Sequence, residues 1–241
     1  KAEDINSMFA DKEVKMIFSV SGGFNSNSVF DYLDYELIKN NPKPLCGFSD
    51  STSIENSIYA KTGVITFNGP TFKSLTSWAT PYAYEEFVKR LMKGDMKLGK
   101  DEDEYITIRE GEAEGILVGG NLSLTSQMTC GKYSIDFENK ILFLEEFYME
   151  SPPESVSNYL YYMKQNGVFN KIKGLWVGNY DGSVPLEKIV LDVLGDKYNF
   201  PIIKSNNFGH TEKKTLIPVG GKARIDTNKQ TKIEIVENFM D

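Results

Sequence analysis

The sequence predicts an α/β protein made of two units, and three patterns indicate it. Through residues 1–92, short apolar runs rich in β-branched residues alternate with segments of helical spacing, an order of elements that builds a parallel sheet. Residues 93–114 are strongly polar, as expected of a segment between domains. From residue 115 strands and helices alternate again, and three short strands close the chain. We therefore expect an N-terminal parallel-sheet domain over 1–92, a polar linker over 93–114 and a C-terminal α/β domain with a mixed sheet over 115–241.

The N-terminal unit is expected to begin with a helix and then to alternate strands with helices. Each strand is a short apolar run, and each helix has apolar residues three or four positions apart. A loop of glycine and short polar residues follows the first strand, where α/β proteins place ligands. The expected elements are helices over 1–13, 29–38, 54–61 and 84–92 and strands over 14–20, 44–48 and 63–67.

The C-terminal unit is expected to continue the alternation before its closing strands. Gly167 ends one helix, and Pro185 lies in the first turn of the next, positions that these residue types favour. The expected elements are strands over 115–122, 140–144, 174–178 and 201–203, helices over 155–166 and 184–194, and closing strands over 216–219, 223–226 and 232–236.

The net charge limits the classes of partner. The 241-residue chain carries a formal charge of −7, whereas nucleic acid and anionic membranes both require a positive footprint on the protein. No apolar run approaches the span of a bilayer. We therefore expect neither partner and favour a small or cationic ligand. The chain begins at Lys1 rather than at Met, so we expect a processed or truncated product.

The cysteine and histidine content predicts neither disulfides nor a metal site. Cys46 lies in a predicted strand and Cys130 in a loop, and His210 is the single histidine. Two separated cysteines do not form a disulfide framework, and no Cys/His spacing fits zinc. We therefore expect no metal, no other cofactor and a cytoplasmic location.

Ser49 is the candidate nucleophile. It follows the predicted strand 44–48 and precedes Asp50, Ser51 and a predicted helix, which suits a serine exposed on a sharp strand-to-helix turn. The pattern departs from G-x-S-x-G because Ser51 stands where the second glycine would be. The alternative is that Ser49 or Ser51 simply caps the helix.

Gly22 and Gly23 are candidates for binding an anion after the first strand. Their backbone N–H groups could hold a phosphate or an oxyanion, but the full spacing of a nucleotide-binding loop is absent. The alternative is that the two glycines only permit a tight turn.

His210 and Glu145 are candidates for a catalytic base and its partner. His210 is the one imidazole available near neutral pH, and it lies just past a predicted strand. Glu145 ends another strand, where its carboxylate could fix the histidine tautomer. The alternatives are a surface or satisfied core histidine, and solvated charges for Glu145 and Glu146.

Five segments, in this order, resemble the LD-carboxypeptidase family of serine peptidases, and in particular its microcin C immunity branch. The likeness spans nearly the whole chain and is specific as a set. The segments are Gly22–Asn27, Asn41–Pro44 with Gly47–Asp50, Gly119–Leu122, Ile141–Glu146 and Phe208–His210. Residues 59–67 and 166–171 are closer to the immunity branch than to the enzymes of murein recycling.

The resemblance implies a catalytic triad and a fold. It makes Ser49 the nucleophile, His210 the base and Glu145 its orienting partner, and it places the backbone N–H groups of Gly23 and Asp50 in the oxyanion hole. It implies a Rossmann-like N-terminal domain and a C-terminal domain with a mixed, partly barrel-like sheet, so that the site forms at their interface. Such proteins have a further strand and helix before the point where this chain begins, which supports truncation.

The resemblance also implies the substrate and the assembly. Asn25, Asn121 and Asp181 are expected to bind substrate, and Asp181 could pair with a free α-amino group or could be only a turn residue. For stacking a nucleotide, the segment between the domains offers Tyr105, while Trp78 and Trp176 are expected to be core or interface residues. A homodimer is expected.

We therefore expect a serine carboxypeptidase or amidase that hydrolyses a short peptide or a peptidyl- or aminoacyl-nucleotide conjugate. The alternatives are an LD-carboxypeptidase of murein tetrapeptide recycling and a vestigial binding protein that keeps the fold without turnover. A nucleotide-binding Rossmann protein is disfavoured by the incomplete phosphate fingerprint.

Overall fold

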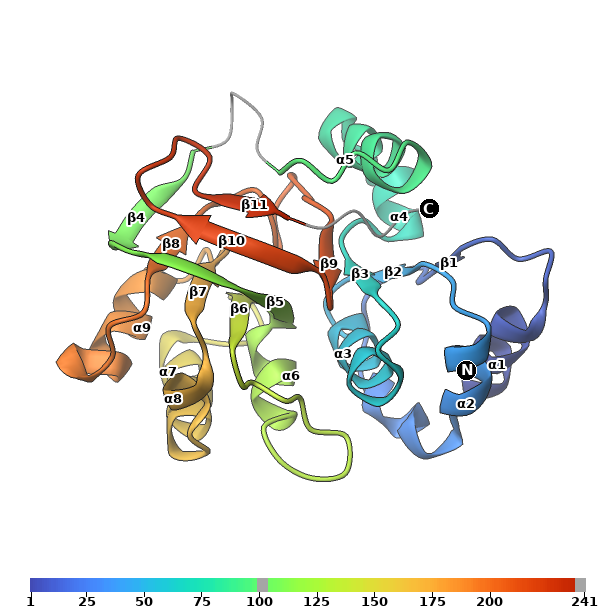
Figure 1. The fold of residues 1–241 in the computed structure, drawn as a ribbon, viewed down its shortest axis with the longest axis horizontal. Helices are drawn as coiled ribbons and strands as arrows, with labels where there is room; N and C mark the ends of the chain where they lie inside the picture. The colour runs from blue at the N-terminus through green and yellow to red at the C-terminus, as the bar shows by residue number, and fades with distance from the viewer. Residues whose placement is uncertain (99–103, 237–241) are drawn as a thin grey trace.

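The computed structural model describes residues 1–98 and 104–236 and contains two sheets. The smaller sheet has the strand order β1-β2-β3-β9, and the larger has the order β11-β10-β5-β6-β7-β8-β4. Figure 1 shows β1, β2 and β3 of the smaller sheet in blue and teal with the orange-red strand β9 beside β3, and the larger sheet in green to red. The predicted α/β class, with a parallel N-terminal sheet and a mixed C-terminal sheet, is confirmed.

The smaller sheet is parallel through its first three strands. These are β1 (Ile17–Phe18), β2 (Leu45–Gly47) and β3 (Thr66–Asn68). All residues of β2 and β3 are buried, as expected for parallel strands covered on both faces. The helices of this half are α1 (Ala2–Ala10), α2 (Tyr35–Asn40), α3 (Ser51–Thr62), α4 (Phe72–Leu75) and α5 (Pro81–Glu86).

The larger sheet places the ends of two parallel strands side by side. Its parallel core is β5 (Glu112–Asn121), β6 (Lys140–Glu145), β7 (Gly174–Val177) and β8 (Ile202–Lys204). The last residues of β5 and β6, Asn121 and Glu145, are register partners. In an α/β protein, ligands bind at the carboxyl ends of such strands.

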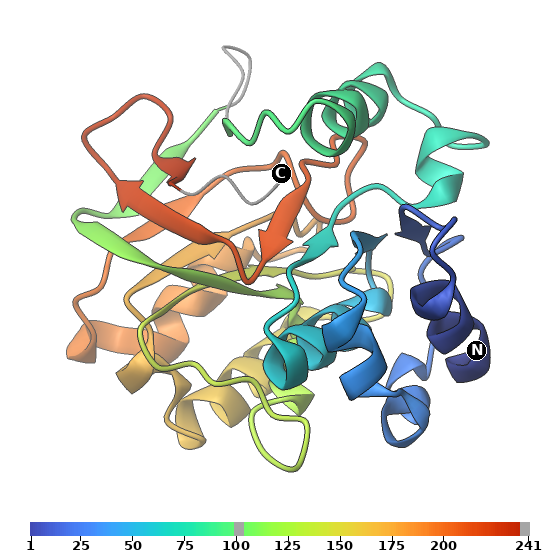
Figure 2. The same cartoon turned by 45° about the vertical axis from the view of Figure 1, so that its right-hand side comes forward.

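Helices cover one face of the larger sheet. Figures 1 and 2 both show them on the side away from β10 and β11. They are α6 (Leu122–Gln127), α7 (Pro153–Gln165), α8 (Val168–Lys171) and α9 (Leu186–Leu194). None of the helices in the described residues is both long and apolar enough to cross a membrane.

The last strands of the chain belong to different sheets. The strand expected over 216–219 is β9 (Ile217–Val219), and it pairs antiparallel with β3 of the N-terminal half. By contrast β10 (Lys222–Asp226) and β11 (Ile233–Ile235) extend the larger sheet. β9 covers the edge of β3, which would otherwise expose unpaired backbone groups. The C-terminal part of the chain therefore completes the N-terminal sheet.

Two of the expected helices and one strand differ in detail. The helix expected over 29–38 is a 3₁₀-helix, η1 (Ser26–Tyr32), followed by α2. The chain is extended at Leu33, and the Asp34 side chain then caps α2 by accepting a hydrogen bond from Leu37 N–H. The helix expected over 84–92 is α5 continued by a π-helical turn, η2 (Phe87–Met92). The first strand is shorter than residues 14–20.

The segment 93–114, expected to be a polar linker, contains ordered strand. β4 (Ile106–Arg109) pairs antiparallel with β8, and β5 already begins at Glu112. The alternation of Ile106 and Ile108 with polar residues was a strand signal within this polar stretch. Of the acidic run 101–104, all but Glu104 lies outside the described residues. The division of the chain into domains at this segment stays a prediction.

Helix α3 carries an unusual set of buried polar residues where the two halves meet. Asn56 donates to Gly119 O (2.8 Å) and accepts from Gly119 N–H (3.1 Å), which joins α3 to β5. Glu55 is fully buried; one carboxyl oxygen accepts from Asn68 Nδ2 (2.9 Å), while the other, Oε1, has no partner in the described residues. Burial raises the pKa of Glu55 to about 8.

We expect Glu55 to make the stability of the fold depend on pH. Its pKa is about 8 in the folded chain against 4.5 for an ordinary glutamate, so between these values the folded state keeps a proton that the unfolded state loses. The free energy of unfolding should therefore decrease as pH rises from 4.5 to about 8, by up to about 1.4 kcal/mol per pH unit. Urea unfolding at pH 5, 6.5 and 8 measures this slope.

Glu55→Gln should flatten that slope, whatever it does to the absolute stability, because glutamine does not titrate. Glu3→Gln, on the exposed part of α1, is the matched control and should leave the slope unchanged. Equal slopes in the parent and in Glu55→Gln would contradict this prediction.

Candidate active site

Ser49 lies on a strained turn between β2 and α3. Its φ angle is 60°, a left-handed conformation that costs a non-glycine residue free energy and is found where function requires it. The N-cap of α3 is Asp50, without a side-chain capping bond, so neither Ser49 nor Ser51 caps the helix. The strained turn therefore favours an exposed nucleophile over the capping alternative.

Glycines on both sides make room for this turn. A Cβ atom on Gly47 would lie 2.5 Å from Ser51 Cβ, and one on Gly22 would lie 2.8 Å from Ser49 Cβ. Real side chains do not approach so closely, so both positions require glycine or a shift of the backbone. The loop 21–27 is thereby pressed against the turn that carries Ser49.

Asp50 ties the glycine loop to the same turn. Its Oδ2 accepts hydrogen bonds from Ser26 N–H (3.1 Å) and Ser26 Oγ (2.6 Å). Among the described residues, the backbone N–H groups of Gly23 and Asp50 donate to no protein acceptor. An oxyanion hole requires such N–H groups without a protein acceptor.

His210 is held by the buried carboxylate of Glu145. The distance from His210 Nδ1 to Glu145 Oε2 is 2.7 Å, and the same oxygen accepts from the His210 backbone N–H at 3.0 Å. Glu145 is fully buried, whereas the His210 side chain is 17% exposed. With Nδ1–H donating to the carboxylate, Nε2 is left as the proton acceptor. This is the tautomer that a general base needs.

The close approach of His210 to Glu145 depends on Gly209, the residue directly before the histidine. Gly209 has φ 103°, and a Cβ atom there would lie 2.8 Å from Glu145 Cβ. The imidazole also packs between two phenyl rings: the centroids of Phe48 and Phe147 each lie 4.5 Å from that of the imidazole, and Phe147 is nearly parallel to it. Its orientation is therefore fixed from several sides.

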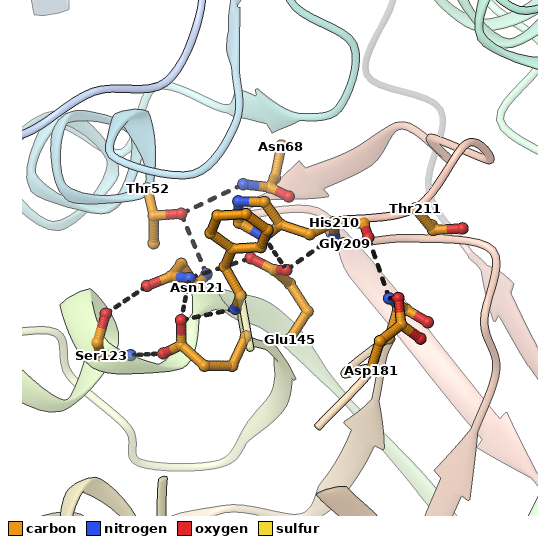
Figure 3. Close-up of polar contacts among 12 residues, drawn as sticks. Thr52, Asn68, Asn121, Ser123, Glu145, Asp181, Gly209, His210 and Thr211 are labelled. Carbon is orange, nitrogen blue, oxygen red and sulfur yellow. Dashed lines mark hydrogen bonds and ion pairs between the residues drawn. The ribbon is translucent and has the colours of Figure 1, made fainter. Parts of the chain in front are cut away.

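A buried hydrogen-bond network supports Glu145 from behind (Figure 3). Asn121 Nδ2 donates to Glu145 Oε1 (3.3 Å) and to Glu146 Oε1 (2.9 Å), and Asn121 N–H donates to Thr52 Oγ1 (3.1 Å). Glu146 also accepts from Ser123 N–H (2.8 Å). Burial, followed by the nearby charge of Glu145, raises the pKa of Glu146. Both glutamates are thus buried network members rather than solvated strand ends.

Ser49 and His210 lie on the wall of one cavity of about 900 Å³. Phe24, Trp78 and Ala83 come to it from the N-terminal half, and Phe147 and Lys214 from the C-terminal half. Three carboxylates also line it: Glu150, Asp181 and Glu212. Such a volume suits a small-molecule or short-peptide ligand.

No hydrogen bond joins Ser49 Oγ to His210 in the part of the chain that the structure describes. Catalytic hydrogen bonds are often long in the absence of substrate and shorten when it binds. The arrangement is compatible with acyl transfer in which the two side chains approach each other as the complex forms.

The loop that carries His210 is attached to the N-terminal half by three hydrogen bonds. All three reach from the segment 80–86 across to residues 212–216, so the two halves are held together beside the cavity. The bonds run from Thr80 Oγ1 to Glu212 O (3.1 Å), between Tyr82 OH and Thr215 Oγ1 (2.6 Å), and from Leu216 N–H to Glu86 Oε2 (3.1 Å).

Of the three residues expected to bind substrate, one lines the cavity and two do not. Asp181 lines the cavity and accepts from Asn179 Nδ2 (3.2 Å), which also donates to His210 O (3.1 Å). Asn121 is buried behind Glu145, and Asn25 is an exposed residue at the start of η1. Neither asparagine is on the cavity wall.

The expectations for the aromatic residues need two corrections. Trp78, expected in the core or an interface, is 64% exposed and lines the cavity. Tyr105, the expected stacking residue, is buried against Trp176, and its hydroxyl accepts from Asn207 Nδ2 (3.2 Å). Tyr105 therefore has no face open to a ligand in the cavity. Trp176 is fully buried, as expected.

Three residues beside His210 are not identified by the sequence patterns, and two of them, Phe147 and Lys214, line the cavity. Phe147, Asn179 and Lys214 all contact His210 or its backbone neighbours. Phe147 directly follows Glu146 and Lys214 lies four residues past His210, so nearness to the candidates was the one available signal. In the described ranges, no cluster of three His, Cys, Asp or Glu side chains could hold a metal ion.

Comparisons with known proteins match both halves of the chain. The family model for the LD-carboxypeptidase N-terminal domain matches residues 1–69, and that for the C-terminal domain matches residues 114–225. "Putative carboxypeptidase YocD" of Bacillus subtilis is 32% identical over 94% of this chain and 77% of its own length. A "Probable murein peptide carboxypeptidase" of the same species is 29% identical over 95% of this chain and 74% of its own length.

A solved structure shares the whole architecture. The microcin C7 self-immunity protein MccF of Escherichia coli, solved in complex with aspartyl sulfamoyl adenosine, superposes with a TM-score of 0.90 at 26% identity. The match covers all of this chain and 81% of the MccF chain. The matches to both domain models, together with 32% identity to a relative over 94% of this chain, show that the chain belongs to the LD-carboxypeptidase family of serine peptidases.

Proposed function

We propose that this protein is a serine hydrolase that cleaves an amide-type bond in a short peptide or in a peptidyl- or aminoacyl-nucleotide conjugate. One observation carries the proposal: a serine held at φ 60° lies on the same cavity wall as a histidine whose Nδ1 binds a buried carboxylate. Membership of a serine peptidase family supports it.

Each side chain has a role in the proposed reaction. Ser49 Oγ attacks the scissile carbonyl carbon while its proton passes to His210 Nε2, and Glu145 stabilises the imidazolium. The N–H groups of Gly23 and Asp50 bind the oxyanion. His210 then protonates the leaving group, and a water molecule, deprotonated by His210, releases the acyl group from Ser49.

The substrate class follows from the wall of the cavity. Glu150, Asp181 and Glu212 surround it with negative charge, which favours a substrate that carries an amino group. Asp181 is the proposed partner of that amino group. The solved MccF complex contains an aspartyl sulfamoyl adenosine, which supports the conjugate, and the murein-peptide relative supports a tetrapeptide as the alternative substrate.

Asn25 and Asn121 need different accounts within this proposal. Asn121 acts on Glu145 through its amide and is a positioning residue. Asn25 lies at the surface beside the glycine loop, and a contact with the distal part of a substrate stays a prediction. A homodimer and a cytoplasmic location also stay predictions.

Ser49→Ala should abolish hydrolysis, with kcat falling by about 10⁴-fold or more, because no other side chain replaces the nucleophile. Reaction of the chain with a fluorophosphonate, followed by intact mass, gives a second readout and should be lost as well. Ser51→Ala, which removes a buried hydroxyl of α3, is the control and should keep both. Full activity in Ser49→Ala with loss in Ser51→Ala would show that the nucleophile is misassigned.

Glu145→Gln should lower kcat/KM by about 10³- to 10⁴-fold, because an amide neither stabilises imidazolium nor fixes the same tautomer. Glu146→Gln should cost much less, since the Glu146 carboxylate does not bond to His210 in the described residues and shares the donor Asn121 Nδ2 with Glu145. Initial rates and thermal unfolding of the two variants separate catalysis from stability. Similar losses of rate in both variants at equal stability would contradict the assignment.

Turnover of two substrates distinguishes the candidate functions. We expect the purified chain to hydrolyse an aminoacyl-nucleotide conjugate with a higher kcat/KM than a murein L,D-tetrapeptide, measured by mass spectrometry of the products. The reverse order would favour the murein function. Tryptophan fluorescence tests the alternative that the protein binds these compounds without hydrolysing them. Of the two tryptophans, Trp176 is buried and Trp78 lines the cavity. Quenching of the fluorescence by both compounds, without turnover of either, would support a binding protein.

A further inference from the structure

Lys214 turns back onto the loop that carries His210. Its ammonium donates to Gly209 O (3.2 Å) and to Thr211 O (2.8 Å), the carbonyl groups of the residues on either side of the histidine. It also lies 4.3 Å from the centroid of the Phe48 ring. Phe48 directly precedes Ser49 and packs against the imidazole of His210.

These contacts engage the ammonium group from both halves of the chain. A lysine ammonium has three N–H donors; two donate to the carbonyls, and the remaining side faces an aromatic ring, where a cation is attracted. Hydrogen bonds from a charged donor are stronger than neutral ones. Lys214 therefore joins the loop of His210, from the C-terminal half, to the turn of Ser49, from the N-terminal half.

Its surroundings contain several charges. Loss of solvent lowers the pKa of Lys214, and the nearby charge of Glu145 opposes that effect. The other titratable side chains on the wall of the same cavity are His210, Glu150, Asp181 and Glu212. A partly buried cation with two of its three hydrogens donated to backbone carbonyls is suited to holding its neighbours in place.

We propose that Lys214 is a further positioning residue for the catalytic base. Its ammonium holds the backbone on both sides of His210 against Phe48, a set of contacts that we call the clamp, and so sets the imidazole relative to Ser49. This inference rests on the proposed function, in which Ser49 and His210 act together. A misplacement of about 1 Å between reacting groups costs up to about 10²-fold in rate, so the clamp has a measurable effect on chemistry.

The rate of reaction with a fluorophosphonate tests the clamp without knowledge of the substrate. In this reaction the bond from Ser49 Oγ to phosphorus forms, the bond from phosphorus to fluorine breaks, the serine proton passes to His210 and fluoride leaves. Lys214→Met keeps the length of the side chain and removes the ammonium. We expect its rate constant to fall by about 10- to 100-fold.

A matched control is available elsewhere in the chain. The Lys164 ammonium also donates to a backbone carbonyl, that of Val193, and lies near an aromatic ring, that of Tyr161, but it belongs to α7, and neither contact involves the cavity. Lys164→Met should react within about twofold of the parent, because it loses the same kinds of contact away from His210. Thermal unfolding of both variants shows whether a slower reaction merely reflects lost stability.

The pH profile of the reaction provides a second test. The rate should fall at alkaline pH as Lys214 loses its proton, and burial, which lowers the pKa of Lys214, brings this decrease below the usual range for lysine. Neutral Lys214 makes weaker hydrogen bonds and no cation–π contact. In Lys214→Arg the alkaline decrease should be absent, because a guanidinium stays protonated.

The outcomes separate this inference from the proposed function. If the parent chain does not react, or reacts equally after Ser49→Ala, the proposed function is wrong. If the parent reacts at Ser49 and the Lys214→Met rate equals that of Lys164→Met, only the clamp is wrong. An alkaline decrease in rate that is the same in Lys214→Arg as in the parent would also overturn the clamp.

Discussion

The hydrogen bond from His210 Nδ1 to the fully buried carboxylate of Glu145 is the contact on which the site depends. A buried carboxylate is costly unless its oxygens are satisfied, and here Asn121 Nδ2, the imidazole and the His210 N–H supply the donors. Asn121 can do so because β5 and β6 are parallel and in register. The sheet thus fixes the carboxylate, and the carboxylate fixes the base.

That arrangement requires the two halves of the chain to stay in one geometry. Ser49 lies on the turn that follows β2 of the smaller sheet, whereas Glu145 ends β6 of the larger sheet and His210 lies in the loop after β8. Asn56 binds the backbone of Gly119, β9 completes the smaller sheet, and the bonds from 80–86 hold the loop of His210. Each of these contacts joins residues that are far apart in the sequence. The site therefore exists only once the whole fold has formed.

Backbone strain and close contacts between backbone segments are concentrated where the two halves of the chain meet, around Ser49 and Gly209. Ser49 and Gly209 both have positive φ, and glycines at 22, 47 and 209 leave no room for a Cβ atom. Such strain persists only where surrounding contacts over-determine it. Asp50, anchored by Ser26, and Lys214, anchored by carbonyls, are two of those contacts. Loosening either should affect the geometry of the site before it affects the fold.

The sequence by itself determined the class of fold, most strands and the candidates Ser49, Glu145 and His210, because apolar runs, turn glycines and a single histidine are local signals. Only the tertiary structure decided that β9 pairs with β3, that Asn121 is buried behind Glu145, and that Trp78 rather than Tyr105 faces the cavity. Exposure, pairing and the clamp by Lys214 depend on residues distant in sequence that meet in space, and no local pattern encodes which of them will meet.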